Sequence, residues 1–204
     1  NAPAISKNEL RLTTLDVGQG LAIVVEVGQQ VLVFDTGPKF SESFNTGEAV
    51  VIPYLRYRGI NHIDKLIVSH GDNDHAGGLQ GILDNMTVGE LVSTFNEEYK
   101  HDNLSTCDAG VVWQWKDVRF QFLYPTEKSK SKAKLSSNNS SCVLHIQHPA
   151  GSMLLTGDIE KSVERQLLET YTDLLDVDVL IAPHHGSNSS STKQFIRGVS
   201  PEYV

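Results

Sequence analysis

Two short segments of the chain concentrate histidine and carboxylate side chains. Four of the eight histidines and two aspartates lie in them: His70, Asp72, Asp74, His75, His184 and His185. A further carboxylate, Asp158, follows Gly157. A divalent cation needs several lone-pair donors that converge on one point, and imidazole and carboxylate groups on tight glycine-rich loops supply them. The segments therefore predict a metal site, although a turn stabilised by its own side-chain hydrogen bonds is the alternative for residues 70–75 alone.

The elements expected around these segments place each candidate ligand at the end of a strand. Apolar runs typical of buried strands precede the candidates at residues 65–69, 152–156 and 177–182. Helical patterns follow at residues 76–83 and 160–171 and after a capping box at residues 191–194. Loops at one edge of a sheet can bring donors from distant parts of the chain together.

The rest of the sequence favours a mixed α/β architecture. Further strands are expected at residues 10–16, 21–27, 30–35, 88–94, 111–115, 118–123 and 142–147, with a helix at 48–57. Residues 127–139 are polar and lack periodicity, which predicts a long flexible loop. Two layers of mixed sheet with outer helices fit this order.

Composition limits the classes of function. The chain has 204 residues, room for one domain, and a formal net charge of −8, which does not point to nucleic acid or an anionic membrane as a partner. No segment approaches the roughly 20 apolar residues of a membrane-spanning helix. Cys107 and Cys142 are too few for a disulfide framework and match no zinc-finger spacing, but a single bridge is left open.

Several motifs resemble a known family. The run from His70 to Gly78 resembles the metal motif of the metallo-β-lactamase superfamily, with Asp72 where most members carry a histidine. Five further motifs are similar, in order, to the hydrolase domain of the ComEC family of DNA-uptake channels: residues 15–20 (LDVGQG), 34–37 (FDTG), 138–144 (NNSSCVL), 155–158 (LTGD) and 182–187 (APHHGS).

The resemblance implies an α/β fold, a four-layer αβ/βα sandwich with mixed sheets, over residues 10–204. We expect this domain to be incomplete at its C-terminal end, because residues 201–204 read as the start of a strand, and we expect residues 1–9 to be a linker or cloning remnant.

The resemblance also implies a two-metal site. Its metal ligands would be His70, Asp72, Asp74, His75, Asp158 as a bridging carboxylate, and His185. Asp74 would orient the attacking hydroxide, and His184 would support a ligand or act as general acid. The superfamily usually has one more ligand histidine where this chain offers Asn138, Asn139 and Ser141, and Asp16 is a further candidate. The exchange of imidazoles for oxygen donors favours manganese, whereas the intrinsic affinity of such sites favours zinc. We therefore expect two ions of Mn or Zn. No small organic cofactor is expected.

The function implied is a metal-dependent phosphodiesterase that degrades the DNA strand not transported during uptake. Its partners would be single-stranded DNA, the transmembrane channel portion of the same polypeptide and other competence proteins, at the bacterial inner membrane. A basic stretch, Lys128, Lys130, Lys132 and Lys134, is a candidate DNA contact, with an ordinary solvated loop as the alternative. A non-catalytic metal- or DNA-binding module of the channel and a metallo-hydrolase of another ester are the rival functions.

Five other residues have ordinary structural interpretations. Asp35 ends a strand in the run FDTG, close to a glycine. We expect it to stabilise a turn, and we expect a role in the site for it less than for Asp16. His145 and the nearby His148 are expected at a surface or sheet edge. Trp113 and Trp115 are expected in the core or on the sheet, with base stacking as the alternative.

Overall fold

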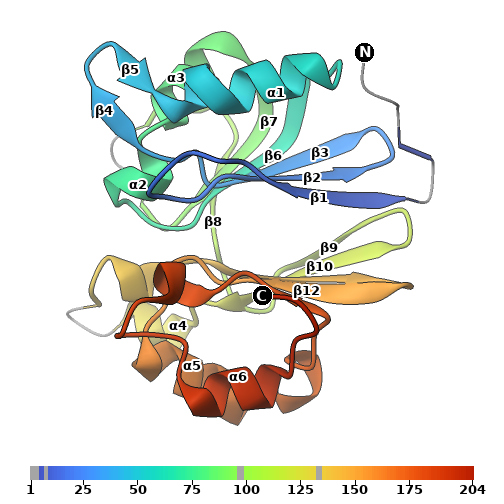
Figure 1. The fold of residues 1–204 in the computed structure, drawn as a ribbon, viewed down its shortest axis with the longest axis vertical. Coiled ribbons are helices and arrows are strands. Elements are labelled where there is room, and N and C mark those ends of the chain that lie inside the picture. The colour runs from blue at the N-terminus through green and yellow to red at the C-terminus, as the bar shows by residue number, and fades with distance from the viewer. Residues whose placement is uncertain (1–4, 7–8, 96–98, 132–134) are drawn as a thin grey trace. The chain divides into compact units, whose positions relative to one another are not determined.

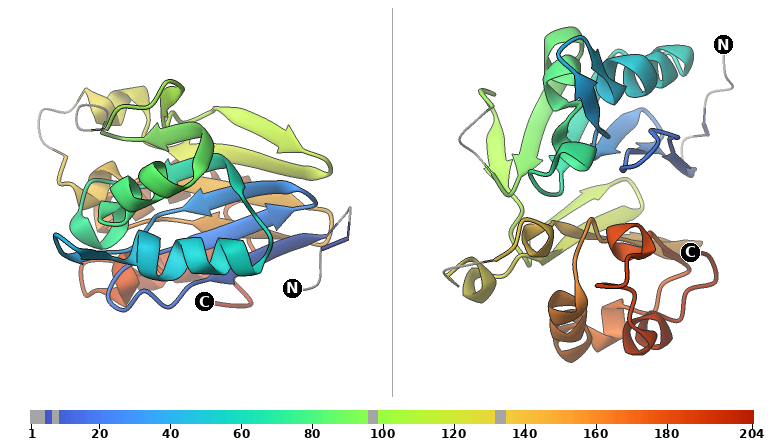
Figure 2. Two further views of the ribbon diagram at one scale, coloured as in Figure 1. Left: turned by 90° about the horizontal axis from the view of Figure 1, so that it is seen from above. Right: turned by 60° about the vertical axis from the view of Figure 1, so that its left-hand side comes forward.

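The computed structural model describes residues 5–6, 9–95, 99–131 and 135–204 (Figure 1). The chain divides into two compact units, Asn1–Thr106 and Cys107–Val204. Each unit has its own mixed sheet, with helices against one face of it (Figure 2). The expectation of mixed sheets with outer helices is therefore met within each unit.

The first unit is built on a six-stranded sheet. In spatial order its strands are β1 (Leu10–Thr14), β2 (Ile23–Val27), β3 (Gln30–Phe34), β6 (His62–Val68), β7 (Thr87–Ser93) and β8 (Leu104–Thr106). The first three form an antiparallel meander, and β3, β6, β7 and β8 run parallel. Parallel strands need crossover connections, and these supply the loops in which the first ligand segment lies.

Helices and a small hairpin complete the first unit. They are β4 (Lys39–Ser41), β5 (Phe44–Asn45), a π-helical turn (Gly47–Val51), α1 (Ile52–Tyr57), α2 (Asn73–Ala76) and α3 (Leu79–Asn85). The core forms where apolar side chains of the helices, such as Leu55 and Leu79, pack with Val33 and Leu66 of the sheet. The helix expected at residues 76–83 is interrupted, since α2 ends at Ala76 and α3 begins at Leu79. Only glycine fits at position 77 between them, because a Cβ there would lie 2.1 Å from the backbone nitrogen of Lys39.

The second unit has a five-stranded sheet. In spatial order its strands are β13 (Val179–Leu180), β12 (Gly151–Leu155), β11 (Val143–His148), β10 (Val118–Tyr124) and β9 (Val112–Trp115), antiparallel except for the parallel pair β12 and β13. Its helices are α4 (Glu127–Lys130), α5 (Lys161–Thr170) and α6 (Lys193–Val199), with 3-10 turns at Asn138–Ser140, Thr172–Leu174 and Pro183–Gly186. Val163 and Leu167 of α5 and Phe195 of α6 pack with Leu154 and Leu180 of the sheet.

Three local expectations in the second unit are wrong. The loop expected at residues 127–139 contains α4 and leads into the turn Asn138–Ser140. Helix α4 forms because Thr126 and Ser129 make a reciprocal capping box, which stabilises a single helical turn that is too short to show periodicity. The strand expected at 177–182 is only Val179–Leu180. Helix α6 is capped by Thr192, not Ser191, because Ser191 has a left-handed backbone (φ 53°) and an N-cap needs an extended one.

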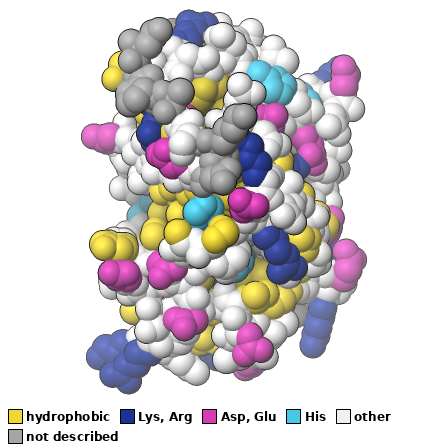
Figure 3. Space-filling view, turned by 90° about the vertical axis from the view of Figure 1, so that its right-hand side faces the viewer, with side chains coloured by type: hydrophobic (Ala, Val, Ile, Leu, Met, Phe, Trp, Pro, Cys, Tyr) yellow, Lys and Arg dark blue, Asp and Glu magenta, His cyan; other side chains and the backbone are white. Residues whose placement is uncertain are grey.

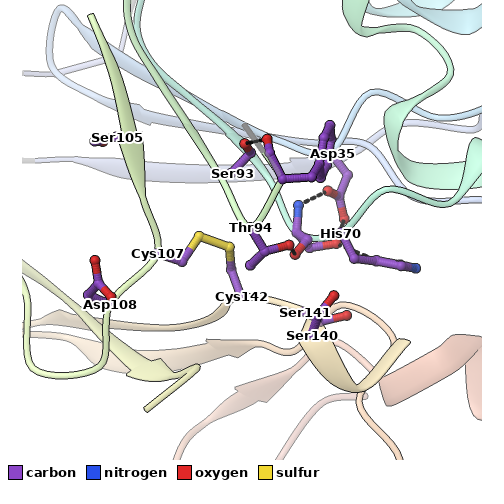
Figure 4. The surroundings of a disulfide bond; sticks show 12 residues. Asp35, His70, Ser93, Thr94, Ser105, Cys107, Asp108, Ser140, Ser141 and Cys142 are labelled. Atoms are coloured by element: carbon purple, nitrogen blue, oxygen red, sulfur yellow. Dashed lines mark hydrogen bonds between the residues drawn. A yellow bond between two sulfur atoms is a disulfide. The ribbon is translucent and has the colours of Figure 1, made fainter. Parts of the chain in front are cut away.

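The two cysteines are bonded to each other. The disulfide joins Cys107 and Cys142, whose Cα atoms are 5.8 Å apart, and Ser141 precedes Cys142 in the chain (Figure 4). Both cysteines are buried. The bridge left open by the composition is therefore present, and it ties the segment before β9 to the start of β11.

Removing this bridge should destabilise the second unit. A cross-link over 35 residues restricts the unfolded chain, so the Cys107→Ser/Cys142→Ser variant should lose about 3 to 4 kcal/mol of unfolding free energy. Urea denaturation of the oxidised protein and of the variant measures the difference, and wild type unfolded in reductant should match the variant. An unchanged midpoint in both comparisons would contradict a structural role for the bridge.

His145 is buried, so its expected place at a surface or edge is wrong. It lies on β11 opposite Gln121 and Leu154, on the side of the sheet that carries core residues. Burial, with a smaller contribution from the positive charge of Arg119, lowers the pKa of His145 to about 4. His148 is half-buried, and its Nδ1 accepts a hydrogen bond from the Ala150 backbone.

The depressed pKa makes stability depend on pH. Between about pH 6.5 and 4 the unfolded chain binds a proton at His145 that the folded chain does not, so the unfolding free energy should fall as the pH falls through this window. One such proton contributes at most about 1.4 kcal/mol per pH unit. His145→Leu should flatten this slope in urea titrations at a series of pH values, whereas His148→Leu should not. An identical slope in His145→Leu and wild type would contradict the assignment.

Trp113 and Trp115 behave as sheet residues. The Trp113 ring stacks on Phe120 with centroids 5.0 Å apart and an interplanar angle of 2°, and the Trp115 ring meets the same phenylalanine edge-on. This confirms the structural interpretation.

None of the helices in the described residues has the length and apolar character needed to cross a bilayer.

Candidate metal centre

The first ligand segment begins where strand β6 ends. Ser69 and His70 follow the buried end of the strand, and Asp72 is the N-cap of the short helix α2, which carries Asp74 and His75. Both imidazoles are fully buried, with ring centroids 4.3 Å apart, whereas the two aspartates are partly exposed. The segment thus places two buried rings beneath two carboxylates.

Asp35 orients His75. An oxygen of the Asp35 carboxylate lies 2.8 Å from His75 Nδ1, and the carboxylate also accepts hydrogen bonds from the backbone nitrogen and the hydroxyl of Ser69 at 2.6 and 2.8 Å. All three residues are buried. A carboxylate that accepts a hydrogen bond from Nδ1–H leaves Nε2 as the lone-pair donor, which is the usual support of a metal-binding histidine.

His70 is held through the same hydroxyl. Its Nδ1 lies 3.0 Å from Ser69 Oγ, which in turn donates to Asp35. His70 Nε2 is 3.5 Å from an Asp72 oxygen, and His75 Nε2 is 3.9 Å from an Asp74 oxygen. One buried carboxylate therefore sets the orientation of both rings.

Asp35 is the site residue that sequence reasoning missed, since it was ranked below Asp16. Asp16 is exposed and its carboxylate accepts a hydrogen bond from the Gly18 backbone at 3.2 Å, the geometry of a turn. Asp35 has a left-handed backbone (φ 61°) that turns its carboxylate toward Ser69 and His75. The available signal was its position at a strand end in the run FDTG.

The backbone around the segment is tightly packed. The carbonyl of Asp74 accepts a hydrogen bond from the Leu21 backbone at 3.1 Å, and a Cβ on Gly20 (φ 143°) would lie 2.3 Å from that carbonyl. The carbonyl of His75 accepts hydrogen bonds from both the backbone and the hydroxyl of Thr36, each at 2.8 Å. Helix α2 is therefore fixed against the loops that follow β1 and β3.

In the second unit a buried carboxylate is flanked by two imidazoles. Asp158 follows β12, and its two oxygens lie 3.8 Å from His184 Nε2 and 3.7 Å from His185 Nε2. Both histidines have left-handed backbones, with φ of 50° and 52°. Non-glycine residues seldom adopt this conformation, and it is concentrated at functional sites, where surrounding structure enforces it.

The turn at residues 138–141 supports this second cluster. Ser141 Oγ accepts a hydrogen bond from the Asp158 backbone at 3.0 Å, and Asn139 Oδ1 accepts one from the Glu160 backbone at 3.0 Å. The Asn138 amide lies 3.4 Å from His184 Nε2. The three predicted additional residues thus contact the loop that carries Asp158 or its neighbour His184.

The ring of His184 is held at both of its nitrogens. His184 has a protein partner at each ring nitrogen, the hydroxyl of Ser189 at Nδ1 (3.0 Å) and the Asn138 amide at Nε2. Such a ring is suited to holding or moving a proton.

The donor atoms in each unit suit a divalent cation. The imidazole-to-carboxylate distances of 3.5 to 3.9 Å exceed those of hydrogen bonds. They approach the spacing of two ligands on one ion, because donors at about 2.1 Å in tetrahedral coordination lie about 3.4 Å apart. The residues present therefore fit metal binding.

Of the four lysines in the basic stretch, the structure describes only Lys128 and Lys130. Lys128 is exposed, Lys130 forms an ion pair with Asp108, and Lys132 and Lys134 lie outside the residues that the structure describes. On the face drawn in Figure 3, basic side chains are interspersed with acidic and hydrophobic ones. A role of these lysines in DNA binding stays a prediction.

Comparison with protein families identifies the fold. The metallo-beta-lactamase superfamily matches residues 15–203. The chain belongs to this superfamily. The resemblance based on the ligand motif is thereby confirmed for nearly the whole chain.

Curated relatives are competence proteins and related sequences. The chain is 36% identical to Competence protein ComA of Neisseria gonorrhoeae, over 98% of this chain and 27% of that protein. It is 35% identical to Recombination protein 2 of Haemophilus influenzae (97% and 24%) and 32% identical to ComE operon protein 3 of Bacillus subtilis (98% and 28%). The predicted relationship to the ComEC family is confirmed, and the chain spans about a quarter of the length of these relatives.

Solved structures share the fold at low identity. The subclass B3 metallo-beta-lactamase MEM-A1 from a soil metagenome gives a TM-score of 0.58 at 13% identity, over 84% of this chain and 76% of that one. CmlA, a diiron β-hydroxylase from Streptomyces venezuelae, gives 0.57 at 11% identity, over 95% and 44%. These likenesses confirm the metallo-β-lactamase fold. Since they include a hydroxylase, the fold alone does not fix the reaction.

Proposed function

We propose that this chain is a metal-dependent phosphodiesterase that cleaves DNA, and that it degrades the strand not transported during uptake. The observation that carries the proposal is the chemistry of the two histidine and carboxylate clusters, the first of which has two imidazoles held in a ligating orientation by Asp35 and Ser69. The choice of DNA rests on the relatives, which are named competence and recombination proteins.

The proposed ligands of two divalent ions are His70, Asp72, Asp74, His75, Asp158 and His185, with Asp158 as the bridge. When bound, the ions would activate water and neutralise the phosphate oxygens, an effect that an acidic chain needs before it can accept a polyanion. The oxygen-rich donor set suits manganese, and zinc is the competitor by intrinsic affinity.

The protein groups would handle orientation and protons. Asp74 is partly exposed and would accept a hydrogen bond from the attacking water. His184 would give a proton from Nε2 to the leaving oxygen, while the Ser189 hydroxyl at its Nδ1 keeps the ring in place. Asp35 and Ser69 would keep the Nε2 atoms of His75 and His70 available for the ions.

The names of the relatives support a role in DNA uptake. We propose single-stranded DNA as the substrate, and other competence proteins and a membrane-embedded channel portion of a longer polypeptide as partners. On this proposal the domain would lie at the bacterial inner membrane. The acidic net charge means that binding of DNA would depend on the ions and on local contacts.

A substrate panel tests the function. The chain, loaded with Mn²⁺ or Zn²⁺, is incubated with single- and double-stranded oligonucleotides, a carboxylic ester and a β-lactam. Cleavage of oligonucleotides that chelator abolishes and metal restores is the expected result. Turnover of the ester or the lactam alone would assign the site to another hydrolase, and binding of metal and DNA without any turnover would indicate a structural module.

A further inference from the structure

We propose that Phe40 and Phe44 form a platform on which a nucleobase of the DNA substrate stacks. The proposal rests on the function proposed above and adds a binding subsite to it. Both residues lie on the β4 and β5 hairpin of the first unit, which projects beyond the sheet next to α2 (Figure 1).

The two rings are exposed and already nearly parallel. Phe40 and Phe44 are 60% and 50% exposed, their centroids are 5.6 Å apart, and their planes meet at 26°. Large apolar side chains exposed side by side need an explanation, whereas scattered ones do not. An offset ring pair of this kind presents flat π-faces to solvent, and every nucleobase has a complementary face.

The hairpin is attached directly to the proposed metal segment. The side-chain amide of Asn73, which lies between Asp72 and Asp74, donates to the Lys39 carbonyl at 3.0 Å and accepts from the Lys39 backbone at 3.2 Å. A base on the platform would therefore be held at a fixed position relative to α2.

A second loop joins the platform to the same segment. The tip of the Phe40 ring lies 4.0 Å from the position that a Cβ would take on Gly18 (φ 75°), and the next residues of that loop pack on the Asp74 carbonyl. The loop that carries Gly18 therefore lies close to both the Phe40 ring and the Asp74 backbone.

The charge near the rings suits a nucleotide rather than a purely apolar partner. Lys39 precedes Phe40 and forms an exposed ion pair with Glu42 at 3.0 Å. Exposed pairs of this kind are weak, so a phosphate can replace Glu42 as the partner of the ammonium group. Neighbouring Ser41 and Ser43 are polar and exposed. A ring platform beside a lysine and hydroxyls matches a base with its backbone phosphate.

The test compares an oligonucleotide with an abasic strand of the same backbone. In wild type, the affinity measured by fluorescence anisotropy and the kcat/KM of cleavage should favour the strand with bases. Phe40→Ala/Phe44→Ala should lose roughly 5- to 100-fold of this preference, the range seen when a stacking aromatic is removed. The abasic strand should be bound and cleaved as before, and Phe40→Trp/Phe44→Trp should restore the preference.

A matched control separates stacking from general effects. Tyr57 is 63% exposed on α1 in the same unit, so Tyr57→Ala should leave the preference unchanged. A preference equal in wild type and the double alanine variant would overturn the platform. If wild type cleaves neither strand, the proposed function fails, and the binding preference alone decides on the platform.

Discussion

Asp158→Ala is expected to lower metal-dependent cleavage of DNA by roughly a thousandfold or more, and to do so more completely than Asp72→Ala. The Asp158 side chain is only 4% exposed, and an imidazole Nε2 stands near each of its oxygens. Asp72 is 45% exposed and lies near one imidazole, that of His70. A carboxylate that serves two ions should matter more than one that serves a single ion. The measurement is kcat/KM on an oligonucleotide at saturating metal.

The comparison needs a carboxylate that is outside the clusters. Asp176 is exposed in the same unit as Asp158, so Asp176→Ala reports the effect of a lost negative charge alone. Urea denaturation of each variant checks that the fold is retained. Equal residual activity in Asp158→Ala and Asp72→Ala, at matched stability, would exclude Asp158 as the bridge.

Asp35→Asn should weaken metal binding and lower activity by about 10- to 100-fold. We treat Asp35 as a positioning residue, which acts through His75 and does not contact the substrate. An amide nitrogen turned toward His75 Nδ1 would donate to it, so the ring proton would move to Nε2, the atom proposed to bind the ion. Calorimetric titration with Mn²⁺ or Zn²⁺ measures the affinity, and nitrogen NMR of His75 reports which ring nitrogen carries the proton.

Asp64→Asn is the matched control for this change. Asp64 is a partly buried carboxylate of the same unit, and it accepts a hydrogen bond from the Val31 backbone at 2.8 Å, apart from the ligand segment. If Asp35 acted only on stability, both variants would leave the His75 tautomer unchanged. The same metal affinity in Asp35→Asn and Asp64→Asn would contradict the positioning role.

The ligand segments could be predicted because their signal is local. The ligand runs follow strands with continuous apolar patterns, and glycine marks the tight turns beside them. The motif from His70 to Gly78 also carries the family resemblance, and the match over residues 15–203 confirms it. The metal ligands themselves and the extent of the domain, residues 10–204, stay predictions.

Features that depend on contacts between distant residues could not be predicted. Asp35 forms a hydrogen bond with His75, 40 residues away in the chain. This contact depends on the left-handed backbone of Asp35, which the pattern of residue types does not predict. His145 alternates with apolar neighbours, which suggests an exposed face, yet both faces of β11 are buried there. The one-turn helix α4 is too short for periodicity, and two cysteines alone do not reveal whether they meet.

The number of divalent ions bound per folded chain is the most direct test of the proposed two-metal site. The chain is equilibrated with Mn²⁺ or Zn²⁺ and its metal content is measured by native mass spectrometry, with circular dichroism as the check of folding. We expect two ions per chain, and fewer in Asp158→Ala. A folded chain that binds essentially no metal at saturating Mn²⁺ and Zn²⁺ would contradict it.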